Sequence, residues 1–158
     1  MNKLYKINNT LRHDWASDEA KSLIDQPLLD LIYQAQTIHR SNFPKNEIQK
    51  SKLLSIKTGS CPEDCSYCSQ SAHHNVDLKK EPLISLGEVV KAAEDAVKEG
   101  ATRFCMGAAW RGPTDKNIDQ VCDMVEAVNG LGLESCVTLG MLKEGHAEKL
   151  AKSGLNYY

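Results

Sequence analysis

Apolar residues follow two different periods along this chain, and the period predicts which segments are helices and which are strands. Within residues 1–50 apolar side chains recur every three or four residues, which is typical of one face of a helix. Ser17 is expected to cap a first helix, Pro27 suits the first turn of a second, and 42–44 should end it. The apolar face of the second helix is predicted to contain Leu28, Leu31, Ile32, Ala35 and Ile38.

From residue 51 onward, short apolar runs alternate with segments of helical period. The predicted strands are 53–58, 102–106, 133–139 and 155–158. The predicted helices are 86–99, 118–128 and 144–152. Ser85 and Glu88 have the spacing of a capping box at the start of the first of these helices, and Gly100 is suited to end it. This alternation predicts an α/β fold with a parallel sheet.

Right-handed crossovers on a sheet that keeps curling in one direction lead to a TIM-type (β/α) barrel. A complete eightfold barrel takes about 250 residues, whereas this chain has 158 residues and reaches a fourth predicted strand. We therefore predict an N-terminal helical segment at 1–50 and, at 51–158, the first half of a barrel that is truncated at the fourth strand. Because proteins avoid unpaired parallel edges, we expect the sequence to be a truncated one or to need a partner that closes the sheet.

Charge and composition exclude several functional classes. The 19 basic residues nearly balance the 21 acidic residues, and they form no basic stripe, so no nucleic-acid partner is expected. No segment is apolar for long enough to span a membrane, and Met1–Lys6 lacks the apolar core of a signal peptide. Six cysteines in a chain with no export signal predict a cytoplasmic protein that uses its thiols for metal binding and not for disulfides.

Three cysteines within eight residues carry the strongest chemical signal. Cys61, Cys65 and Cys68 have the spacing C-x3-C-x2-C, which supplies one ligand fewer than a four-iron cluster needs and leaves one iron open to a substrate or cofactor. A structural zinc site usually takes two cysteine pairs, and a bacterial ferredoxin motif continues to a fourth cysteine. Three unrelated buried cysteines fit this density poorly. We therefore predict a 4Fe–4S cluster with one open iron.

Two further cysteines lie on predicted strands. Cys105 is two residues before Gly107 and Cys136 is four residues before Gly140, so the two thiols are expected to share one face of the sheet. Arg103 and Glu134 share that face by the same count, and the opposite face is apolar: Phe104, Met106, Val137 and Leu139. Polar groups inside a barrel need partners. The two cysteines are therefore either ligands of a second metal centre or ordinary buried residues, whereas Cys122 is expected to be a core residue.

Several segments resemble the biotin synthases, a family of radical S-adenosylmethionine enzymes on a barrel fold. The resemblance rests on residues 55–60 with the cysteine loop, on 69–72, on 104–110 and on 136–140, and it covers the chain from about Asp14 onward. Ser69 stands where the family commonly has proline, which affects the loop and no metal ligand.

The resemblance implies two iron–sulfur clusters and one cofactor. Cys61, Cys65 and Cys68 would hold the 4Fe–4S cluster, whose open iron would bind S-adenosylmethionine. Cys105 and Cys136 would be two ligands of a 2Fe–2S cluster. The implied cofactor contacts are Tyr67 against the adenine and Gly107, Ala108 and Ala109 beside the methionine end, with Ala108 offering its carbonyl.

The implied reaction is radical-mediated sulfur insertion, which converts dethiobiotin to biotin. The resemblance also implies a reduced flavodoxin- or ferredoxin-type electron donor and a homodimer. A third cysteine and an arginine of the family's second cluster are not in this chain, so these residues alone are expected to be inactive. Two alternatives remain. One is a radical S-adenosylmethionine enzyme without sulfur insertion, which need not place thiols on both strands. The other is a cluster-binding fragment without activity.

Three residues beside the cysteine loop are expected to have lesser roles. His73 and His74 are predicted to be solvated loop residues, and Lys57 is expected only to support the loop.

Overall fold

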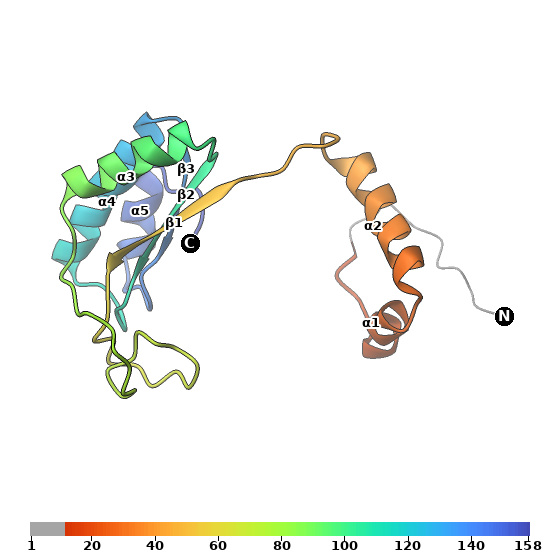
Figure 1. Ribbon diagram of the computed structural model, residues 1–158, viewed down its shortest axis with the longest axis horizontal. Coiled ribbons are helices and arrows are strands. Elements are labelled where there is room, and N and C mark those ends of the chain that lie inside the picture. The colour runs from red at the N-terminus through yellow and green to blue at the C-terminus, as the bar shows by residue number, and fades with distance from the viewer. Residues whose placement is uncertain (1–11) are drawn as a thin grey trace. The chain divides into compact units, whose positions relative to one another are not determined.

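The computed structural model describes residues 12–158 (Figure 1). The first eleven residues, which include Met1–Lys6 and the start of the predicted helical segment, lie outside the described part. The chain divides into two compact units, Met1–Ile48 and Gln49–Tyr158.

The first unit contains the two helices that the sequence predicts, α1 (Ser17–Ile24) and α2 (Leu28–Asn42). The prediction that Ser17 is the N-cap was wrong, because Ser17 is the first helical residue. The preceding residue, Ala16, is the N-cap and donates its N–H to the Glu19 carboxylate at 3.0 Å, which is the half of a capping box that needs no hydroxyl at the N-cap. Neither helix buries a residue, and the apolar face predicted for α2 stays largely exposed, because two short helices alone cannot cover it.

The second unit is a parallel sheet with strand order β1-β2-β3 and three helices. The strands are β1 (Ser51–Lys57), β2 (Arg103–Ala108) and β3 (Glu134–Thr138). The helices are α3 (Leu86–Lys98), α4 (Asp115–Gly130) and α5 (His146–Lys152), and Figure 1 shows them on one side of the sheet. The predicted strand–helix alternation is thus confirmed.

The predicted fourth strand is only begun. Tyr157 forms a single parallel bridge with Cys136. It donates its N–H to the Ser135 carbonyl at 3.2 Å and accepts the Val137 N–H at 3.0 Å. One bridging residue does not make a strand, so 155–158 was wrong as a strand prediction, although its place beside β3 is the predicted one.

The core lies between the sheet and the helices. Ile56, Phe104, Met106, Val137 and Leu139 are fully buried on the helix side of the sheet and pack with side chains of α3, α4 and α5. The strand parity predicted from the sequence is therefore correct. Helix α3 buries Val89, Ala93 and Ala96, whereas Leu86 and Val97, near its two ends, are each 42% exposed.

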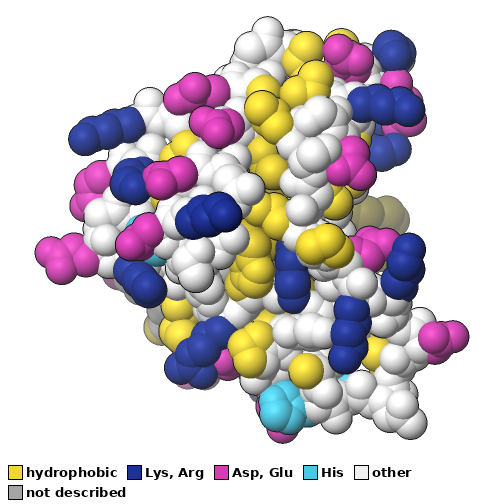
Figure 2. Space-filling view, turned by 90° about the vertical axis from the view of Figure 1, so that its left-hand side faces the viewer, with side chains coloured by type: hydrophobic (Ala, Val, Ile, Leu, Met, Phe, Trp, Pro, Cys, Tyr) yellow, Lys and Arg dark blue, Asp and Glu magenta, His cyan; other side chains and the backbone are white. Residues whose placement is uncertain are grey.

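Helix α3 begins as predicted. Ser85 donates its N–H to the Glu88 carboxylate at 2.8 Å, and Glu88 donates its N–H to the Ser85 hydroxyl at 3.3 Å. Helix α4 has the same arrangement between Thr114 and Asn117. Figure 2 shows one face of the molecule, where basic and acidic side chains are interspersed around a stripe of hydrophobic ones.

Across residues 12–158, none of the helices has both the length and the apolar character that a membrane crossing requires.

Candidate metal and cofactor site

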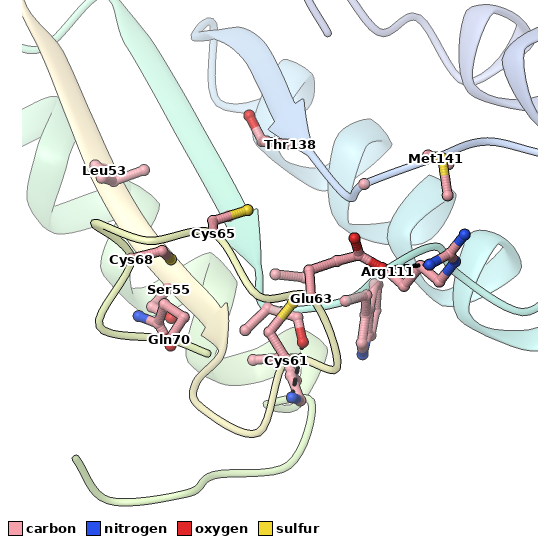
Figure 3. A pocket seen from close by; sticks show the side chains of 16 residues that line it. Leu53, Ser55, Cys61, Glu63, Cys65, Cys68, Gln70, Arg111, Thr138 and Met141 are labelled. Carbon is pink, nitrogen blue, oxygen red and sulfur yellow. Dashed lines mark hydrogen bonds and ion pairs between the residues drawn. The ribbon is translucent and has the colours of Figure 1, made fainter. Parts of the chain in front are cut away.

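A cavity of about 470 Å³ lies where the three strands of the second unit end (Figure 3). Active sites of (β/α) barrels form at this end of the strands. The cysteine loop contributes Cys61, Glu63, Cys65, Cys68 and Gln70 to the lining, and β1 contributes Leu53, Ser55 and Lys57. The segments after β2 and β3 contribute Trp110, Arg111, Gly140 and Met141.

The cysteine loop is closed at its base by main-chain hydrogen bonds. Cys61 donates its N–H to the Gln70 carbonyl at 2.9 Å, and Ala72 donates to the Cys61 carbonyl at 2.8 Å. The Gln70 side chain accepts the Gly59 N–H at 2.6 Å. Gly59 has a φ of 72°, which costs a glycine little and lets the chain turn from β1 into the loop. The sequence therefore forms a closed loop whose three thiols all line one cavity.

All three thiols are free, and Cys65 is exposed. Within residues 12–158 no three cysteine, histidine or acidic side chains stand close enough together to form a ready-made metal site. The donor set nevertheless fits an iron–sulfur cluster, because three soft thiolates from one short loop line the same cavity.

Gly107, Ala108 and Ala109 line the cavity from the end of β2, so the structure brings this predicted segment together with the three thiols. The Ala109 N–H donates to the Lys57 carbonyl at 2.9 Å, which fixes the segment to β1. The Ala108 carbonyl accepts the Trp110 N–H at 2.8 Å and keeps one lone pair for a ligand. Tyr67 is different, because its side chain is 93% exposed and does not line the cavity.

Cys105 and Cys136 stand directly opposite each other on β2 and β3. Each lies two residues before a residue that lines the cavity, Gly107 or Thr138, and therefore on the same face of the sheet. Burial raises the pKa of the Cys105 thiol, and the hydrogen bond and the charge of Cys136 raise it further, whereas Arg103 lowers it.

The two charged residues of this face, Arg103 and Glu134, pair with each other. The Arg103 guanidinium forms an ion pair with Glu134 at 2.9 Å and stacks over the Tyr157 ring at 3.6 Å. Arg103 and Glu134 are also paired in register two residues before Cys105 and Cys136, so all four side chains share one face, as predicted.

Several contacts of the site were missed by the sequence reasoning. Glu63 and Arg111 form an ion pair of 2.6 Å that joins the cysteine loop to the segment after β2 (Figure 3). His73 and His74 are not merely solvated: their Nε2 atoms lie 3.1 Å from the Pro62 carbonyl and 2.9 Å from the Cys65 carbonyl. These contacts form because the chain folds back on the loop, and no local pattern signals them. The one available signal for a role of Glu63 was its position between Cys61 and Cys65 in the sequence.

The segments after β2 and β3 touch at the edge of the cavity. Met141 donates its N–H to the Arg111 carbonyl at 2.7 Å. Gly140 has a φ of 85°, and a Cβ there would lie 2.4 Å from the Arg111 carbonyl oxygen. Only glycine permits this approach.

A parallel α/β sheet with three thiols in a C-x3-C-x2-C loop after its first strand defines a class of protein. The family model described as the radical SAM superfamily matches residues 55–158. The chain belongs to the radical S-adenosylmethionine superfamily, whose members hold a 4Fe–4S cluster and use S-adenosylmethionine.

The chain is similar to proteins named biotin synthase in several bacteria. It is 56% identical to that of Thioalkalivibrio sulfidiphilus over 148 residues, which are 94% of this chain and 44% of the relative. For Psychromonas ingrahamii the identity is 56% over 153 residues, 96% of this chain and 44% of the relative. For Dechloromonas aromatica it is 58% over 144 residues, 91% of this chain and 44% of the relative. The chain thus spans less than half the length of these relatives.

The fold is also similar to the crystal structure of methylornithine synthase. The TM-score is 0.67 at 15% identity, and the match covers 96% of this chain and 43% of that chain. At this identity the likeness shows the fold alone. The chain therefore has the fold of a part of a TIM-type (β/α) barrel, as predicted.

Proposed function

We propose that this chain provides the cluster-binding and cofactor-binding part of a biotin synthase, which converts dethiobiotin to biotin. The observation that carries the proposal is the lining of one cavity by the three free thiols of the cysteine loop and by Gly107–Ala109, with Cys105 and Cys136 on the same face of the sheet. The biotin synthases that match at 56% and 58% identity support the particular reaction.

In this proposal Cys61, Cys65 and Cys68 hold a 4Fe–4S cluster, and Cys105 and Cys136 are two ligands of a 2Fe–2S cluster. When bound, the first cluster supplies the electron that cleaves S-adenosylmethionine, and the second supplies the sulfur that enters dethiobiotin. The paired strand thiols support this second role, because a non-sulfurating enzyme has no need of them.

The chain's own residues bind and orient the cofactor. Gly107 has no side chain, so the main chain of the segment 107–109 is accessible from the cavity. The free lone pair of the Ala108 carbonyl is suited to accept a hydrogen bond from the amino group of S-adenosylmethionine. The proposal gives Tyr67, which is adjacent to Cys68, the adenine ring as its partner. Leu53, Trp110 and Met141 provide apolar side chains to the lining of the cavity.

The proposal also includes a reduced flavodoxin- or ferredoxin-type electron donor, a homodimer and a cytoplasmic location. The location is supported by the six cysteines, all of which are free.

A chimera tests the proposal with a complete active site. The aligned segment of the Psychromonas ingrahamii biotin synthase is replaced by this chain, and the chimera is expressed in a biotin auxotroph. We expect growth without biotin, and we expect residues 1–158 alone to give none. Cys61→Ala, Cys65→Ala and Cys68→Ala should each abolish growth, whereas Cys122→Ala, a change at a cysteine packed against the core, should not.

Two results would contradict the proposal. A chimera that accumulates normally but supports no growth would contradict the assignment of biotin synthesis to this chain. A chimera that cleaves S-adenosylmethionine with dithionite but forms no biotin would favour a radical enzyme without sulfur insertion.

A further inference from the structure

Lys57 is the last residue of β1, at the point where the register between β1 and β2 shifts. A shift of this kind re-aims a side chain next to a functional site. The Lys57 side chain is half-buried and lines the cavity together with Cys61.

The Lys57 ammonium connects two segments of the site. It donates to the carbonyl of Gly59, at the base of the cysteine loop, and to the carbonyl of Ala109 at 2.8 Å, in the segment after β2. An ammonium has three N–H donors, so one donor remains for a group inside the cavity.

The charge of Lys57 is not balanced by an acidic side chain. The other cation of the lining, Arg111, pairs with Glu63 at 2.6 Å. Lys57 has no ion pair within the described residues 12–158, and its two hydrogen bonds go to main-chain carbonyls. Burial lowers the pKa of the Lys57 ammonium, and the neighbouring Cys61 opposes this effect. A cation held in this way is stabilised when negative charge enters the cavity.

We propose that Lys57 is a positioning residue whose ammonium fixes the cysteine loop to the segment 107–109 and offsets the negative charge of thiolate-bound iron. The inference rests on the proposed function, because it needs the three thiols to bind a cluster. It goes beyond support of the loop: the charge itself should stabilise the bound cluster and set its reduction potential.

Four variants separate charge from hydrogen bonding. Lys57→Met removes both, Lys57→Gln keeps a donor without the charge, and Lys57→Arg keeps both. Lys52→Met is the matched control, because Lys52 lies on the same strand but pairs with Glu99 at 2.8 Å, away from the cavity lining. Each protein is reconstituted anaerobically with iron and sulfide. Three quantities are measured: the iron bound per chain, the rate of iron loss to a chelator, and the midpoint potential from an EPR-monitored titration.

We expect Lys57→Met to lose iron about tenfold faster than the wild type, as substitutions of residues that support metal ligands commonly do. Its midpoint potential should be more negative. Both oxidation states of the cluster lose the stabilisation by a neighbouring cation, and the reduced state loses more of it because it carries more negative charge. Lys57→Gln should show the same shift in potential but lose iron more slowly than Lys57→Met. Lys57→Arg and Lys52→Met should match the wild type.

The outcomes distinguish this inference from the proposed function. If the wild type binds no iron, both are overturned. If the wild type binds iron and Lys57→Met keeps its potential and iron-loss rate, only the role of Lys57 is overturned. Circular dichroism checks that each variant is folded. If Lys57→Met does not fold, Lys57→Gln decides: a wild-type potential in that variant overturns the role of the charge.

Discussion

Cys105 and Cys136 occupy directly opposite positions on two neighbouring parallel strands. This register places the two thiols side by side below a cavity that contains the other three candidate ligands. Two sets of thiols on two different elements allow their chemical roles to be separated by substitution.

The first prediction concerns this separation. In the chimera, Cys105→Ala and Cys136→Ala should abolish biotin formation but leave reductive cleavage of S-adenosylmethionine close to the unsubstituted level, because the cysteine loop is intact. Cys61→Ala should abolish both reactions. Methionine release and biotin formation are measured in the same anaerobic assay. Biotin formation by the Cys105→Ala chimera would contradict the assignment of the second cluster.

The second prediction concerns the two faces of the sheet. Phe104 is fully buried on the helix side, so Phe104→Ala should lower the free energy of unfolding by about 3–5 kcal/mol. Leu53 is 73% exposed on the opposite face, and Leu53→Ala should change the free energy of unfolding by about 0.5 kcal/mol or less. Urea unfolding of both variants provides the measurement. Equal losses would mean that both faces are packed.

The third prediction concerns the contact between the segments after β2 and β3. Gly140→Ala places a Cβ 2.4 Å from the Arg111 carbonyl oxygen at a φ of 85°, and it should destabilise the protein by about 1–3 kcal/mol. Gly130, the last residue of α4, has open space around it. Gly130→Ala should therefore be neutral or stabilise by up to about 1 kcal/mol. Thermal unfolding of the two variants distinguishes these outcomes, and a tolerated Gly140→Ala would speak against the close approach.

The fourth prediction is a pH dependence of stability. His146 is buried and its Nε2 lies 2.8 Å from Asp115 Oδ1. This hydrogen bond, helped by the charges of Lys143, His146 and Lys149, lowers the pKa of the Asp115 carboxyl below its ordinary value. Because the folded state lowers this pKa, the carboxylate stabilises the fold fully when the pH is above the ordinary pKa of an aspartate, which is about 4. The contribution is lost as the pH falls through the lower, folded-state pKa.

Asp115→Asn therefore should be less stable than the wild type at neutral pH, and the difference should shrink below about pH 4. Urea unfolding at several pH values measures it. Asp123→Asn is the control, since Asp123 is exposed on the same helix and forms no ion pair within residues 12–158. A difference that is constant down to strongly acidic pH would contradict the role of the Asp115 charge.

Local patterns predicted the elements and their faces well. The period-two alternation around Cys105 and Cys136 gave the correct faces, because neighbouring side chains of a strand must point to opposite sides. Local patterns did less well at element ends. Ser17 suits an N-cap, but the helix begins one residue earlier, with Ala16 at the N-cap. Leu86, the first residue of α3, is apolar and yet 42% exposed.

Contacts between distant segments were beyond such patterns. The hydrogen bond between His74 and the Cys65 carbonyl, and the ion pair between Glu63 and Arg111, both depend on how loops fold back. The exposed ring of Tyr67 likewise reflects the conformation of the loop and not its composition.

The order of residues alone determined the helices, the strands, the face on which each strand side chain lies and the spacing of the three clustered thiols. These properties follow from bonding between near neighbours along the chain. The tertiary structure decided that the cysteine loop meets the segment 107–109 across one cavity, that Cys105 stands opposite Cys136, and that Lys57 reaches the Ala109 carbonyl. Such contacts join residues far apart in the chain, and only the packing of helices against the sheet fixes the register that brings them together.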